Sequence, residues 1–163
     1  MDAFNIRDEE YIDLIAPIVE HHEFKKLKGF NHHKGSVFTH SVLVSYLSYK
    51  IARKFNLDYI SIARGGLLHD FFLYDWKIEG KLNKKSFMKK HGFTHAREAF
   101  DNANQFFEIN DIEKDIIIKH MFPLNLPPPK TLESCIVTMV DKYVAIVEYR
   151  DRILNSQRLL RLK

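Results

Sequence analysis

The sequence is poor in cysteine, and this scarcity limits the chemistry open to it. Its 163 residues include one cysteine, Cys135, so no disulfide can form within the chain. A single cysteine is typical of proteins from a reducing compartment. Cys135 precedes the apolar run 136–140, which predicts a buried core residue rather than a nucleophile.

Long apolar runs are also missing. None approaches the ~20 residues that a helix needs to cross a bilayer. The residues Met1-Asp2-Ala3-Phe4 are mixed in polarity and lack the apolar segment of a secretory signal. We therefore expect a cytoplasmic protein with no membrane partner.

Strand-like alternation of apolar and polar residues does not persist anywhere in the sequence. Apolar residues instead recur every three or four positions, which predicts an all-α fold of about six to eight helices. The length and the lack of internal repeats predict one domain over residues 1–163.

Capping residues and apolar stripes place the first helices. One is expected from about Asp8 into the twenties, and a second from Ser36 to Phe55. A third should follow Asp58, a plausible N-cap, and reach about Phe71. It contains Gly65-Gly66, and paired glycines inside a helix indicate close approach of another backbone.

Three later helices follow from the same signals. One should begin at His95 with Thr94 as its cap, and another after Asp111. The proline-rich segment 123–130 predicts a loop. The last main helix, 131–149, is apolar on most sides at first, which predicts a central buried position. A solvated basic tail should follow it.

The sequence carries a net charge of +4 with a pI near 9.1. This mildly basic balance fits an anionic partner, such as a phosphorylated small molecule or a nucleotide. It is too weak to indicate a nucleic-acid partner.

Histidine is the unusual residue type, with nine in the chain. His40, His120 and Asp141 lie on the apolar stripes of three expected helices, and the pair His69-Asp70 lies on a fourth. A buried unpaired carboxylate is costly, so several such groups require mutual compensation. A metal ion compensates carboxylates and imidazoles together, and inward ligands on helices are a common way to build a two-metal site.

These residues and their surroundings resemble the HD superfamily of metal-dependent phosphohydrolases. The similar phrases are Phe38-Thr39-His40-Ser41, Gly66-Leu67-Leu68-His69-Asp70 and Val140-Asp141-Lys142, with His95 and His120 between the doublet and the last aspartate. The resemblance covers about residues 30–150 and implies a compact HD-domain helical bundle.

The resemblance also implies the site. Asp70 would bridge two divalent cations and be central to catalysis. His40, His69 and Asp141 would hold one cation, and His95 and His120 the other. A metal-activated water would then attack phosphorus. Iron is favoured for this ligand set, and manganese, nickel or zinc also suit it.

Several nearby residues have open roles. Lys142 is a candidate phosphate-binding group or a structural partner of Asp141. His91, expected just outside its helix, is a candidate catalytic or substrate group or a surface histidine. Asp75 is a candidate hydrogen-bond acceptor for a ligand or the start of a turn. Arg64 is expected to pair structurally with a carboxylate.

Two other functions fit the same pattern. Some HD-fold proteins with these six ligands hold a mixed-valent di-iron pair and activate oxygen. A non-catalytic nucleotide- or partner-binding module is the other alternative. The Gly-Tyr-Pro signature of the branch that cleaves cyclic di-GMP is missing after His120, which argues against that substrate. The sequence leaves the substrate and the oligomeric state open.

Overall fold

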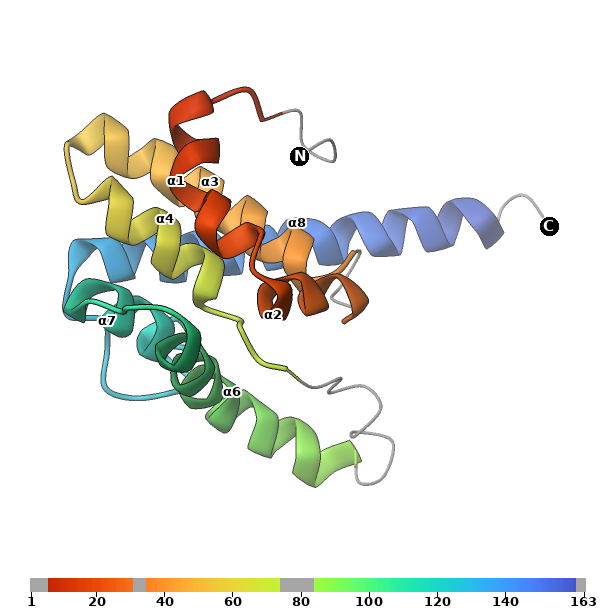
Figure 1. The fold of residues 1–163 in the computed structure, drawn as a ribbon. Coiled ribbons are helices and arrows are strands. Elements are labelled where there is room, and N and C mark those ends of the chain that lie inside the picture. The colour runs from red at the N-terminus through yellow and green to blue at the C-terminus, as the bar shows by residue number, and fades with distance from the viewer. Residues whose placement is uncertain (1–5, 31–34, 74–83, 161–163) are drawn as a thin grey trace.

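The computed structural model describes residues 6–30, 35–73 and 84–160, with side chains for 6–30, 35–73 and 94–151 (Figure 1). The elements are α1 (Glu9–Val19), α2 (His22–Lys25), the 3-10 helix η1 (Lys26–Gly29), α3 (Val37–Phe55), α4 (Tyr59–Leu68), α6 (Lys84–Phe106), α7 (Asp111–Lys119) and α8 (Leu132–Leu160). No strand occurs in these ranges, so the predicted all-α fold is confirmed. None of the described helices is long and apolar enough to span a membrane.

The beginnings of α3 and α4 follow the predicted caps. Ser36 caps α3 through a capping box with Thr39, and the Asp58 side chain accepts a hydrogen bond from the Ser61 amide at 2.9 Å. The α4 helix ends at Leu68, three residues earlier than predicted. His69 Nδ1 lies 2.7 Å from the Gly66 carbonyl. In a continuing helix that carbonyl would accept a hydrogen bond from the backbone amide four residues later, so the side chain replaces a helical bond.

Gly65 and Gly66 let α4 lie tightly between two other helices. A Cβ added to Gly66 would stand 2.9 Å from the Ser45 Cα in α3, and one added to Gly65 would stand 2.8 Å from the Ile116 side chain in α7. The predicted close approach is therefore confirmed. It holds the end of α4 beside the two helices that carry His40 and His120.

Two predicted helix starts were wrong. The α6 helix begins at Lys84, so Thr94 is not its cap and His95 lies inside it. The lysine-rich residues before Thr94 have good helix propensity, and the glycine among them costs only about 1 kcal/mol relative to alanine. The α7 helix is capped by Asn110 rather than Asp111, because Asn110 and Glu113 form a reciprocal capping box.

The position of α8 also differs from the prediction. The helix runs on to Leu160, through most of the predicted tail, and extends beyond the rest of the bundle (Figure 1). Val137 and Val144 face the core, whereas Met139 is exposed, so α8 lies at the edge of the molecule rather than at its centre. Cys135 is exposed on the same side, and its predicted burial was wrong.

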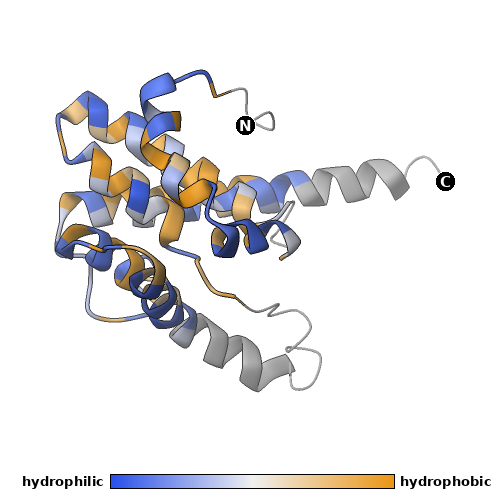
Figure 2. Cartoon of the chain, in the orientation of Figure 1, coloured by the Kyte–Doolittle hydropathy of each residue, from blue (hydrophilic) through white to orange (hydrophobic). Residues whose placement is uncertain are grey.

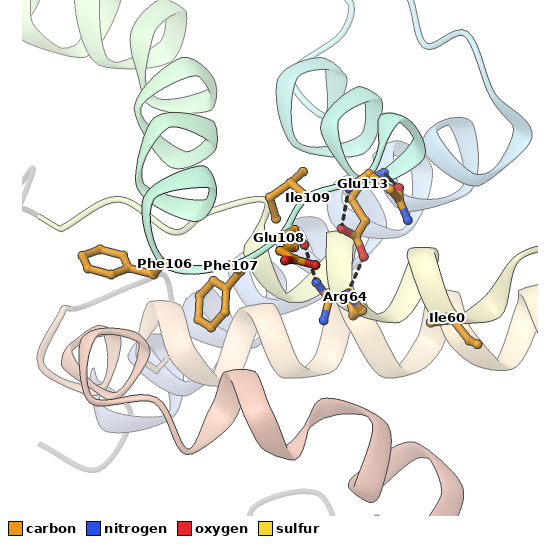
Figure 3. Close-up of a pocket in the computed structure, with 8 residues that line it drawn as sticks. Ile60, Arg64, Phe106, Phe107, Glu108, Ile109 and Glu113 are labelled. Carbon is orange, nitrogen blue, oxygen red and sulfur yellow. Dashed lines mark hydrogen bonds and ion pairs between the residues drawn. The ribbon is translucent and has the colours of Figure 1, made fainter.

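Hydrophobic and hydrophilic residues are interspersed along the helices (Figure 2), and the buried hydrophobic residues form a core cluster. Arg64 has the structural role predicted for it: its guanidinium lies 2.5 Å from Glu113 and donates to the Glu108 carbonyl at 2.7 Å. Arg64, Glu108 and Glu113 line a pocket of about 650 Å³, together with Phe106 and Phe107 (Figure 3). None of its lining residues is a candidate metal ligand.

Candidate metal centre

The structure brings all six predicted ligands together from five segments. His40 lies in the first turn of α3, His95 in α6 and Asp141 in α8. The doublet His69-Asp70 follows the last residue of α4, and the sixth candidate, His120, is the C-cap of α7. Four of the six side chains, His40, His69, Asp70 and His120, thus lie at the ends of helices.

The first triad consists of His40, His69 and Asp141. Asp141 Oδ1 lies 3.1 Å from His40 Nε2 and 3.7 Å from His69 Nε2. The potential ligand atoms all lie within 4.8 Å of one another. This spacing is suitable for a single ion between them.

The second triad consists of Asp70, His95 and His120. The Nε2 atoms of His95 and His120 face each other at 3.0 Å. Two nitrogens bound to one ion at about 2.1 Å and at a right angle would lie about 3.0 Å apart. The pair therefore has the separation expected of two ligands on one cation.

Asp70 lies between the triads. Its Oδ2 is 3.5 Å from His69 Nε2 in the first triad. Its other oxygen, Oδ1, is 3.6 Å from His95 Nε2 and 3.5 Å from His120 Nε2 in the second. The two carboxylate oxygens thus face different triads, which is the arrangement required of a bridging ligand.

The imidazoles are oriented by bonds on their outer nitrogens. His69 Nδ1 lies 2.7 Å from the Gly66 carbonyl, and His120 Nδ1 lies 2.8 Å from the Ile117 carbonyl. A neutral histidine that donates from Nδ1 keeps a lone pair on Nε2, which is the form that binds metals. His69 Nε2 is fully buried and has no hydrogen-bond partner among the described residues, so a cation would satisfy it.

Glu148 is a component of the site that the sequence prediction missed. Its Oε2 lies 3.3 Å from His40 Nδ1, behind the nitrogen that faces Asp141. Carboxylate partners of this kind fix a ligating histidine and raise its basicity. The available signal was the spacing, because Glu148 follows Asp141 by two helical turns and shares its face of α8.

The charges of the cluster are strongly coupled. Burial alone would lower the pKa of His40, but hydrogen bonds to Asp141 and Glu148 raise it to about 10. Burial alone would raise the pKa of Asp70, but the surrounding imidazoles hold it well below its ordinary range. The pKa of Asp141 is lowered by His40 and His69 in the same way. Carboxylates that stay ionised while buried require positive charge beside them.

Of the three further residues considered near the site, the structure describes the side chain of Lys142 but not those of His91 and Asp75. The Lys142 ammonium donates to the His120 carbonyl at 2.9 Å and the Thr138 carbonyl at 3.4 Å, and burial lowers its pKa. It therefore anchors the end of α7 rather than pairing with Asp141. His91 lies inside α6, contrary to the prediction, and its side chain is outside the described residues, as is all of Asp75.

A comparison with protein families matches the chain to the HD domain over residues 37–146. No curated protein and no solved structure gives a significant match. The matched region includes all six candidate ligands and the part of α8 that carries Asp141. The chain therefore belongs to the HD-domain family, whose members are generally metal-dependent hydrolases.

Proposed function

We propose that the protein is a metal-dependent phosphohydrolase whose six candidate ligands hold two divalent cations. Its substrate would be a nucleotide or another phosphorylated small molecule, cleaved as a phosphomonoester or a phosphodiester. The HD-domain match supports the hydrolase class. The observation that carries the two-cation proposal is Asp70, whose oxygens face separate triads.

The donor set fits intermediate transition metals. Four imidazoles and two carboxylates without a thiolate suit iron, manganese, nickel or zinc better than magnesium, which prefers oxygen ligands. We propose iron as the first element to test. The outer bonds of His69 and His120 to backbone carbonyls support the metal-binding form of both rings.

When bound, the cations would lower the pKa of a water molecule and stabilise negative charge on phosphoryl oxygens. The chain's own residues have separate tasks. Asp70 keeps the two triads at a fixed separation, and Glu148 orients His40. Lys142 remains a proposed phosphate-binding group, but its ammonium would have to leave the His120 carbonyl to reach a substrate.

The proposal is tested by an activity screen of anaerobically purified protein reconstituted with iron, manganese, nickel or zinc. The substrates are nucleoside mono- and triphosphates, cyclic nucleotides and linear dinucleotides. We expect phosphate ester hydrolysis that Asp70→Asn abolishes and that Asp101→Asn, a change at an exposed aspartate of α6, leaves intact. Oxygen uptake with polyol or phosphonate substrates, without ester hydrolysis, would instead support the oxygenase alternative.

A further inference from the structure

The outward face of α8 is apolar over most of its described length. Met139 is 72% exposed, Ile146 68% and Tyr143 62%. Leu132 and Tyr149 extend the same exposed stripe toward its two ends. A contiguous patch of large exposed apolar side chains is typical of an interaction site.

The spacing of this stripe is that of a helix that packs against another helix. Leu132, Met139 and Ile146 are seven residues apart. Apolar residues at a seven-residue interval keep one seam on one side of a helix. The stripe adjoins an apolar groove of about 610 Å³ formed with α3.

The stripe is complementary to itself in an antiparallel arrangement. If two copies of α8 cross with their Asp141 residues level, positions equally far from Asp141 meet. Met139 then lies against Tyr143 of the second copy, and Ile136 against Ile146. Every such layer in the middle of the seam joins two apolar side chains.

The charges at the ends of the stripe favour the same arrangement. Glu133 lies near one end and the exposed Arg150 near the other. The antiparallel alignment places Glu133 of each copy level with Tyr149 of the second, one residue from its Arg150. A parallel alignment would instead place Arg150 against Arg150, and like charges oppose association.

We propose that the protein forms a two-fold symmetric dimer through the outward faces of α8, packed antiparallel about Asp141. The stripe from Leu132 to Tyr149 covers about 27 Å of helix, at 1.5 Å per residue. Phe55 of α3, 66% exposed beside the groove, widens the surface available to the second copy. The proposal does not depend on the proposed activity, because the metal ligand Asp141 lies on the opposite face of the helix.

Sedimentation velocity over a range of protein concentrations tests the dimer. We expect the unmodified protein to be dimeric at micromolar concentration. Met139→Glu with Ile146→Glu should weaken association at least 100-fold, whereas the matched control Ile60→Glu, at an exposed residue of α4, should leave it unchanged. A monomeric unmodified protein, or a dimer that survives the paired glutamates, would overturn the proposal. Circular dichroism verifies that each variant is folded.

Crosslinking with a short bismaleimide tests the orientation. In the antiparallel dimer the two Cys135 residues are twelve residues apart along the seam, about 18 Å, and should not crosslink. Ile136→Cys with Ile146→Cys, in a Cys135→Ser background, should crosslink efficiently. Each of these two cysteines alone should not. Efficient crosslinking through Cys135 alone would show a parallel seam and contradict the antiparallel register.

The end charges provide a finer test. Arg150→Glu removes two symmetry-related ion pairs and should weaken dimerisation by up to about fivefold for each, the range of an exposed ion pair. Glu133→Arg in the same chain should restore the affinity. The double variant is needed because Glu133 also accepts a hydrogen bond from the Asp58 amide, so a change at Glu133 has an effect within its own chain. Restoration of affinity supports the antiparallel contact, and additive loss from the two changes would overturn it.

Discussion

The two triads differ in how each supplies negative charge to a cation. The first has a carboxylate of its own, Asp141, and a further carboxylate, Glu148, behind His40. The second has two imidazoles that face each other at 3.0 Å and depends on the shared Asp70 for its carboxylate. We infer that the first triad binds its cation more tightly and fills first.

The triads also differ in the elements that support them. The first draws on α3 and α8, which pack against each other and against α4. The second depends on α6 and on the end of α7, where Lys142 holds the His120 carbonyl. Loss of the second cation should therefore be possible without loss of the first.

Removal of the shared carboxylate should have the largest effect because it breaks both triads. We predict that Asp70→Ala depletes both cations and lowers turnover by about 10³-fold or more. Metal content by elemental analysis and activity on the same preparation measure this. Asp101→Ala, at an exposed aspartate of α6, is the control. An Asp70→Ala protein with full metal and full turnover would remove Asp70 from the site.

Removal of one second-triad imidazole should separate the triads. We predict that His120→Ala loses mainly the second cation and most activity, while the first cation remains. The complementary change His40→Ala should lower occupancy at the first triad. Elemental analysis of each variant measures how much metal remains, and loss of both equivalents from His120→Ala would show that the triads are not independent.

A change at Glu148, which contacts His40, should lower the metal affinity of the first triad without changing that of the second. Glu148→Ala removes the carboxylate next to His40 Nδ1, so we predict a 10- to 100-fold weaker affinity for the first cation only. Glu148→Gln, which keeps a hydrogen-bonding group, should lose less. Competitive titration with a chelator measures both affinities. An unchanged first site would leave Glu148 without a role in orienting His40.

The smallest effect is expected at a buried hydroxyl that belongs to neither triad. The buried Tyr11 hydroxyl donates to Ser45 Oγ at 2.8 Å, so Tyr11→Phe should cost about 1 kcal/mol of stability and leave metal content unchanged. Burial raises the pKa of Tyr11 above its ordinary value of 10. The stability it contributes is therefore complete below pH 10 and is lost as pH rises above 10. Denaturant melts at pH 8 and pH 11 should show a smaller alkaline loss for the variant.

The sequence predicted most of the ligand set because those residues break a local pattern. His40 and His120 occupy positions of apolar stripes, and the doublet His69-Asp70 follows a helix with paired glycines. Such positions are costly without a partner, so the pattern alone pointed to a shared site. The structure brings these residues together, although the number and identity of the ions stay predictions.

Other features depend on tertiary context that the pattern does not contain. The apolar residues around Cys135 could not show which side of α8 faces the core. The start of α6 was missed because Thr94 resembles a cap, while the preceding lysines support a helix without an apolar stripe. Lys142 follows Asp141 in sequence, but its side chain extends to a carbonyl of another helix.

The central claim is that the six residues hold two cations. The most direct test is the metal content per chain, measured by mass spectrometry of the unmodified protein after anaerobic reconstitution and removal of free metal. We predict about two equivalents per chain, because the described residues form two triads. One equivalent or less, at saturating metal, would contradict it.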